Sequence, residues 1–159
     1  MRNMTKGLLI GLAALPLAVG CSSDGGGSSD AVDQAHDVQD AYVEAFEAGD
    51  ADAMIELHSD DATWVNQTHR DTRTGTAAMT NLLEWVVEAT DLDQSEIVDR
   101  FVSDDGTEGV IVYHWVGHRT DNGEAFDLDM THVQEYENGE ITQVTASFAN
   151  SDASDQLTG

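Results

Sequence analysis

The chain has 159 residues, with 31 Asp and Glu against 6 Lys and Arg, so its formal net charge is −25. This length suits one domain with short attachments, and 40% hydrophobic residues with three tryptophans are enough for a single core. The charge argues against a nucleic-acid partner, which needs clustered Lys and Arg, and the one cysteine excludes an intramolecular disulfide or a paired-cysteine metal site.

Residues 1–20 have the pattern of an export signal. Arg2 and Lys6 give a positive start, and the apolar run over 7–19 is too short to span a bilayer. Small residues precede Cys21, as in a bacterial lipobox, where the cysteine becomes the lipid-modified N-terminus. We therefore expect a lipoprotein signal peptide and a domain that Cys21 anchors to a bacterial membrane, outside the cytoplasm. The alternative is an ordinary secretory signal followed by an incidental cysteine.

The stretch after the cysteine is Gly- and Ser-rich with no apolar side chain over 22–30, which predicts a flexible tether over 21–30. From Cys21 onward the chain keeps four arginines, no lysine and all 31 acids, a formal charge of −27. These acids are spread out and form no calcium-loop pattern, which favours a solvated acidic surface over a cation site. We expect a folded domain over 31–150 and a disordered tail over 151–159.

Apolar residues at helical spacing predict a first helix that ends at Gly49. Asp50 can cap a short second helix and Thr76 a third one, with a strand candidate over 62–65 and a polar loop over 66–74 between them. Four longer strands are predicted over 96–103, 109–120, 125–137 and 141–148. Helices followed by an antiparallel meander indicate an α+β fold with the helices on one face of a curved sheet.

Four motifs lie along the predicted domain. They are Tyr42-Val43-x-Ala45-x-x-Ala48-Gly49-Asp50-x-Asp52, Leu57-x-x-Asp60-Asp61-Ala62-Thr63, Arg73-x-Gly75-Thr76-Ala77-Ala78 and Tyr136-Glu137-Asn138-Gly139-Glu140-Ile141. With the order of elements, they resemble the nuclear transport factor 2-like superfamily, which includes SnoaL-like cyclases and ketosteroid isomerases. The resemblance implies a cone of three N-terminal helices packed on a curved antiparallel β-sheet. It implies less about function, because the fold hosts isomerases, cyclases, hydrolases and non-enzymatic modules.

The two central strands have one apolar face. A two-residue turn at Asn122-Gly123 would set Tyr113 opposite His132 and Trp115 opposite Met130. The face expected to meet the helices then holds Ile111, Tyr113, Trp115, Phe126, Leu128, Met130, His132 and Gln134. The other face mixes valines with charges. In the superfamily that the chain resembles, this outer face often supports a dimer, so a homodimer is one expectation and a plain exposed face the alternative.

The last strand conflicts with a regular hairpin. A two-residue turn at Asn138-Gly139 would place Val144, Ala146 and Phe148 opposite the polar side of the preceding strand. One extra residue near Thr142-Gln143 removes the conflict, which predicts a β-bulge there.

The resemblance also implies site residues. Tyr42 falls on the oxyanion tyrosine of ketosteroid isomerases and His132 near the second oxyanion position, but the position of the general base falls on Asn66, which cannot accept a proton. The familiar ketosteroid isomerase activity is therefore not expected. Tyr42 and His132 remain the candidate catalytic residues, as oxyanion donor and acid/base group. The alternative is that both are core residues with satisfied hydrogen bonds.

Further side chains would line an apolar pocket around these two. The candidates are Trp64, Asn66, Tyr113, Trp115, Met130, Gln134 and Phe148. No metal or cofactor is predicted. His114 and His118 lie four residues apart in a strand, about 13 Å, which is too far for one ion. No P-loop or dinucleotide-binding motif occurs in the sequence.

These observations predict a membrane-anchored, extracytoplasmic domain that binds a small, mostly apolar molecule in a cone-shaped pocket. Whether it is an enzyme stays open, and cofactor-independent acid/base chemistry of the isomerase, cyclase or hydrolase type is the expected reaction if it is. The alternative is a non-catalytic envelope module for binding or dimerisation. An open cavity between Trp64, Tyr113, Trp115, His132 and Phe148 would favour the first interpretation, and a filled space the second.

Overall fold

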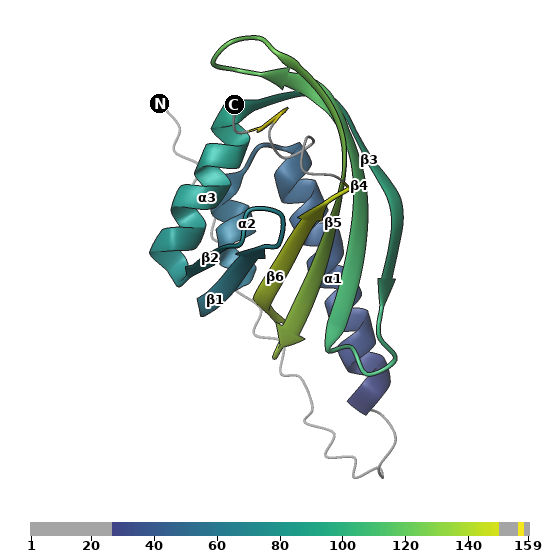
Figure 1. The fold of residues 1–159 in the computed structure, drawn as a ribbon. Helices are drawn as coiled ribbons and strands as arrows, with labels where there is room; N and C mark the ends of the chain where they lie inside the picture. The colour runs from purple at the N-terminus through teal and green to yellow at the C-terminus, as the bar shows by residue number, and fades with distance from the viewer. Residues whose placement is uncertain (1–26, 150–155, 158–159) are drawn as a thin grey trace, which may run out of the picture.

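The computed structural model describes residues 27–149 and 156–157, which hold three α-helices and one six-stranded sheet (Figure 1). The elements are α1 (Gly27–Glu47), α2 (Ala51–Glu56), β1 (His58–Asn66), β2 (Asp71–Thr74), α3 (Thr76–Ala89), β3 (Thr90–Val102), β4 (Glu108–Arg119), β5 (Ala125–Glu137) and β6 (Glu140–Phe148). The predicted signal peptide, Cys21 and the first part of the tether lie outside the described residues. Within the described part, no helix is both long and apolar enough to cross a membrane.

The first two helices follow the sequence prediction closely. Gly49 has a φ of 66° and ends the turn after α1, a left-handed conformation that favours glycine. The carboxylate of Asp50 accepts a hydrogen bond from the backbone N–H of Ala53 at 3.0 Å and so caps α2. However, α1 begins at Gly27, so the last four residues of the predicted tether, 27–30, form its first turn.

The third helix is capped differently from the prediction. Gly75, with a φ of 86°, takes the N-cap position, and Thr76 is already the first helical residue. The Thr76 hydroxyl donates instead to the backbone oxygen of Asp60 at 3.2 Å. Thr76 therefore ties the start of α3 to β1.

The strands are ordered β2-β1-β6-β5-β4-β3, and all neighbouring pairs are antiparallel except β1 and β6. The prediction of a wholly antiparallel sheet is therefore corrected by one parallel pair. The chain leaves β1 and β2 through α3, crosses to the far edge at β3, and returns strand by strand until β6 meets β1. The sheet curves around α1, and α3 covers the side next to β1 and β2 (Figure 1).

Three strands differ in extent from the prediction: β1 begins at His58 rather than at residue 62, and the edge strands β2 and β3 lack an apolar pattern. The segment over 66–74, predicted as a loop, contains β2, which pairs with β1 from Thr63↔Thr74 to Asn66↔Asp71. All four β2 residues are exposed or half-buried, so no alternation marks them as a strand. The edge strand β3 begins at Thr90, earlier than the predicted 96, for the same reason.

The turn between β4 and β5 is longer than predicted. His132 pairs with Ile111, and Met130 with Tyr113, so the register differs by two residues. Thr120 lies in the turn, outside the ladder, and its hydroxyl donates to the backbone oxygen of Glu88 near the end of α3 at 2.6 Å. A shift of two residues keeps every side chain on its face, and all eight residues predicted to point inward are buried.

The predicted β-bulge in β6 is confirmed. Tyr136 pairs with Ile141 and Glu135 with Gln143, so Thr142 is the extra residue. Its effect is that Ile141 and Val144 are both fully buried.

The end of the chain also contributes to the core. Leu157 is 7% exposed among the core residues, and the side-chain oxygen of Gln156 accepts the backbone N–H of Asp127 at 3.2 Å. The predicted disordered tail over 151–159 is therefore wrong for these two residues, because a single leucine finds an apolar site that the sequence does not reveal.

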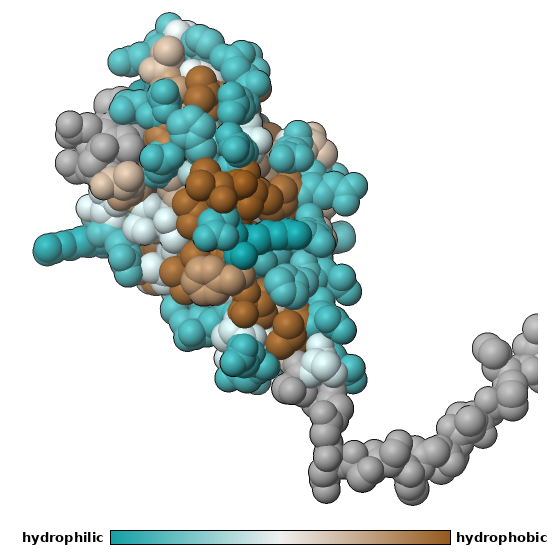
Figure 2. Space-filling model, turned by 90° about the vertical axis from the view of Figure 1, so that its right-hand side faces the viewer, coloured by the Kyte–Doolittle hydropathy of each residue, from teal (hydrophilic) through white to brown (hydrophobic). Residues whose placement is uncertain are grey.

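The outer side of the sheet is more polar but not uniformly so. Figure 2 looks at the side where β3 forms the sheet edge, and apolar areas interrupt its hydrophilic surface. On β3, Val98 is 58% and Phe101 56% exposed. Their exposure contrasts with the closed inner face, where the pocket lies.

Candidate ligand-binding pocket

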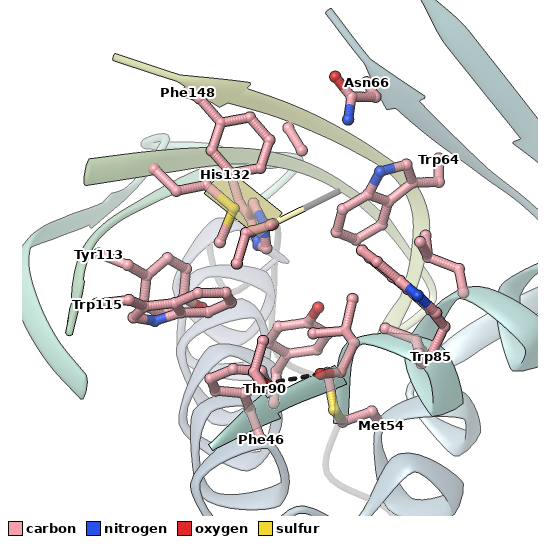
Figure 3. A pocket seen from close by; sticks show the side chains of 17 residues that line it. Phe46, Met54, Trp64, Asn66, Trp85, Thr90, Tyr113, Trp115, His132 and Phe148 are labelled. Atoms are coloured by element: carbon pink, nitrogen blue, oxygen red, sulfur yellow. Dashed lines mark hydrogen bonds between the residues drawn. The ribbon is translucent and has the colours of Figure 1, made fainter. Parts of the chain in front are cut away.

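A cavity of about 70 Å³ lies between the helices and the inner face of the sheet. Eight of the nine residues predicted to form a site line it: Tyr42, Trp64, Asn66, Tyr113, Trp115, Met130, His132 and Phe148. The space between these side chains is therefore open. Figure 3 shows Tyr113 and Trp115 on one side of it and Trp64 and Trp85 on the other.

Gln134 is the predicted site residue that does not line the cavity. It shares the inner face of β5 with His132, but it lies two residues further toward the β5–β6 turn. Its side-chain oxygen accepts a hydrogen bond from the Tyr136 hydroxyl at 2.7 Å, and Gln134 is fully buried. Sharing a strand face is thus not sufficient to reach the cavity, because the curved sheet brings only part of that face to it.

Sequence reasoning missed several wall residues. The most informative is Trp85, which lies on α3 outside the predicted buried stripe, is 41% exposed and still lines the cavity. Its position three residues after buried Leu82 is the signal that could have revealed it. Together with Trp64 and Trp115, it places all three tryptophans of the chain at the cavity.

His132 is the buried imidazole of the cavity wall. It is 3% exposed, and neither ring nitrogen has a hydrogen-bond partner among the described residues. Its ring packs edge-on against Trp64 and Tyr113, with centroids 5.0 and 5.2 Å away. Burial lowers the pKa of His132 to about 3, and nearby His58 adds to this shift. At neutral pH the ring is therefore neutral, with one N–H donor and one acceptor nitrogen.

The tyrosines of the cavity are also neutral donors. Burial raises the pKa of Tyr42 and that of Tyr113 far above the ordinary value, so both hydroxyls keep their protons. The Tyr113 hydroxyl and the indole N–H of Trp115 have no partner among the described residues. An apolar space with unpaired neutral donors is suited to a ligand that carries hydrogen-bond acceptors.

His58 is a further buried histidine that the sequence did not mark. Its Nδ1 lies 2.8 Å from the backbone oxygen of Met54, to which it donates, and its ring packs edge-on behind Tyr42 at 5.9 Å. Burial lowers the pKa of His58, and the bond to Met54 opposes part of that shift. His58 supports the Tyr42 ring from outside the cavity lining.

A surface groove of about 500 Å³ adjoins the cavity. The two spaces share four wall residues, Trp64, Asn66, Leu82 and Trp85, and we call this shared wall the mouth. The groove adds His69, Asp71, Arg73 and Asn81, a polar set absent from the cavity. The Arg73 Nε donates to Asp71 at 2.9 Å.

No group of three metal-binding side chains occurs in the described part of the chain. The two histidines of β4 contact different carboxylates: His114 Nδ1 lies 2.9 Å from Asp129 and His118 Nδ1 3.0 Å from Asp93.

The fold and the pocket define a cone-shaped α+β domain with a small apolar cavity. The chain belongs to the family of SnoaL-like domains, whose family model matches residues 40–144. None of the curated proteins matches the chain in sequence.

Several solved structures are similar to this one. A candidate polyketide cyclase from Xanthomonas campestris pv. campestris is 26% identical, with a TM-score of 0.64, and the match covers 80% of this chain and 98% of that protein. A candidate polyketide cyclase from a Silicibacter species is 23% identical, with a TM-score of 0.65 over 79% and 96% of the two chains. A candidate isomerase from Bacillus subtilis is 14% identical, with a TM-score of 0.70 over 81% and 96%. The last two likenesses concern the fold alone.

Proposed function

We propose that this domain binds a small, mostly apolar molecule that carries a hydrogen-bond acceptor, such as a carbonyl oxygen. The observation that supports the proposal most strongly is His132, which lines the cavity and whose two buried ring nitrogens have no partner among the described residues. A buried polar atom without a partner costs about 1–3 kcal/mol. A ligand oxygen that accepts the imidazole N–H would offset that cost.

The cavity sets a limit on the ligand. At about 70 Å³ it holds only the apolar body of a compact molecule, and a larger one would extend through the mouth into the groove. Trp85 is 41% exposed at this mouth and is the wall residue that can move aside at least cost.

Tyr42 and His132 suit the polarisation of a carbonyl group. Both are neutral donors at neutral pH, and hydrogen bonds from such donors stabilise negative charge that develops on oxygen. A reaction of the isomerase, cyclase or hydrolase type needs no cofactor for this step. The likeness to the candidate polyketide cyclase from Xanthomonas supports a cyclase-type reaction.

Binding without turnover is the second candidate. Among the described residues that line the cavity, none is Asp, Glu, Lys or Arg. Proton removal would depend on His132, and a pKa of about 3 makes this imidazole a weak base at neutral pH. The non-catalytic interpretation is therefore favoured by the absence of a carboxylate at the described wall.

A matched pair of ligands tests the proposed binding function. Cyclohexanone and methylenecyclohexane have the same shape, but only the ketone accepts a hydrogen bond. In NMR titrations, the ketone should bind about 2- to 10-fold more tightly, with the largest shifts at the three tryptophan indole signals. His132→Phe should abolish this preference, whereas Val98→Ala on the exposed edge strand should keep it. Equal binding of the two ligands to the wild-type protein would contradict the proposal.

We also propose that Cys21 carries a lipid that holds the domain on the outer side of a bacterial membrane. Support comes from the charged start, the apolar run and the small residues before this single cysteine. Cys21→Ser should move the protein from the membrane fraction to the soluble fraction. A wild-type protein already soluble after cell fractionation would rule the anchor out. A homodimer through the outer sheet face stays a prediction of the sequence.

A further inference from the structure

Three residues on adjacent strands form a row across one wall of the cavity. Asn66 of β1 lies opposite Ala146 of β6, and Ala146 lies opposite His132 of β5. All three residues line the cavity. Neighbouring strands are about 4.8 Å apart, so the Cα atoms of Asn66 and His132 are about 10 Å apart. In the ladder, the residue between these two polar residues is Ala146, whose side chain is a single methyl group.

The amide of Asn66 has a defined orientation. Its Oδ1 accepts a hydrogen bond from the backbone N–H of His69 at 3.1 Å. A backbone N–H requires an acceptor, so this contact identifies the oxygen end of the amide. The Nδ2 is consequently the opposite end, and Figure 3 shows it pointing toward the side of His132 and Trp64. An amide nitrogen only donates, so Asn66 presents a fixed donor at the mouth.

We propose that Asn66 determines specificity by donating from Nδ2 to a second acceptor oxygen of the ligand, while His132 holds the first. This inference rests on the proposed binding function and narrows the ligand class. The ligand would be a compact apolar molecule with acceptor oxygens at opposite ends, such as a dicarbonyl compound. Ala146 provides the space for its body, because a longer side chain there would fill the gap between the two donors.

The charge of the two polar side chains in the row affects which ligand groups they can bind. Here the two polar ends of the row are both neutral, Asn66 by its chemistry and His132 by its low pKa. A carboxylate at this position would instead repel a carbonyl oxygen. The chemical difference between an amide nitrogen and a carboxylate oxygen therefore provides a direct test.

The test compares cyclohexane-1,4-dione with cyclohexanone in NMR titrations. The wild-type protein should bind the dione about 2- to 10-fold more tightly, the effect of one added hydrogen bond. Asn66→Asp keeps the size of the side chain and an oxygen that accepts from the His69 N–H, but it replaces the donor Nδ2 with a second acceptor oxygen. This variant should lose the preference for the dione and favour 4-hydroxycyclohexanone, which can donate to the carboxylate.

Asn81→Asp is the matched control, because it makes the same chemical and charge change in the groove, at a residue that does not line the cavity. It should keep the wild-type preference for the dione. Ala146→Leu should abolish binding of the dione. The thermal unfolding midpoint of this variant checks that it is folded.

The inference is overturned if the wild-type protein binds both ketones equally, or if Asn66→Asp and Asn81→Asp behave alike. In that case, the proposed binding function would still stand if the protein binds cyclohexanone more tightly than methylenecyclohexane and loses this preference in His132→Phe. If cyclohexanone itself binds no better than methylenecyclohexane, the proposed function fails and this inference fails with it.

Discussion

The two faces of the sheet place histidine in opposite environments. On the inner face, His132 is buried without a hydrogen-bond partner among the described residues, and its pKa falls to about 3. On the outer face, His114 lies 2.9 Å from the Asp129 carboxylate, and this hydrogen bond, with the surrounding acids, raises the pKa of His114. The two residues lie on neighbouring strands of one sheet, and the alternation of side chains along each strand places them on opposite faces. Burial therefore keeps one imidazole neutral, whereas the neighbouring acids favour the protonated form of the other.

The acidic composition sharpens this contrast. The buried polar side chains of the described residues are Gln39, His58, His132 and Gln134, with no Asp or Glu among them. Carboxylates lose too much hydration energy to enter an unpaired apolar site. The chain therefore keeps its negative charge outside, and the cavity stays neutral in a protein of formal charge −25.

The largest expected difference between the faces is in stability. Trp115 is 3% exposed and stacks on Phe46 with ring centroids 4.5 Å apart, whereas Phe101 on β3 is 56% exposed. Trp115→Ala should lower the free energy of unfolding by about 3–5 kcal/mol. Phe101→Ala should lower it by about 1 kcal/mol or less. Urea denaturation measures both, and equal losses would show that the outer edge belongs to the core of an assembly.

An effect of pH on stability, smaller over any one pH unit, is expected on the inner face. The pKa of His132 is near 6.5 in the unfolded state, but burial lowers it to about 3 in the folded protein. Because the unfolded state binds more protons in this window, stability should fall as the pH drops, by up to about 1.4 kcal/mol per pH unit. His132→Phe should show a flatter pH dependence of unfolding than the wild-type protein. A histidine NMR signal of residue 132 that titrates near pH 6.5 would contradict its burial.

The smallest effect, of opposite sign, is expected on the outer face. The raised pKa of His114 means that its ion pair stabilises the fold below the unfolded pKa and loses this contribution as the pH rises through the folded pKa. His114→Gln should therefore weaken the fold more at pH 5 than at pH 8. NMR titration should place the midpoint of His114 above the ordinary value. A midpoint below it would show that Asp129 does not hold this ring in solution.

Several features of the fold could be predicted because they depend on alternation within a strand. The bulge at Thr142 follows from apolar residues that cannot otherwise share a face. The prediction that His132 points inward is confirmed, although the turn before β5 has two more residues than expected. A register shift of two residues leaves each side chain on the same face of the sheet. The strand β2 could not be predicted, since four polar residues at an edge carry no pattern.

The family, the three helices and the inward face of β4 and β5 follow from residues that lie close together in the chain. The tertiary structure selects the inward residues that meet at the cavity. It excluded Gln134, which bonds to Tyr136 instead, and added Trp85 from α3. It also oriented the Asn66 amide through the His69 N–H and left His132 without a partner among the described residues. Hydrogen bonding and burial depend on the neighbours that packing brings together, and those neighbours come from distant parts of the chain.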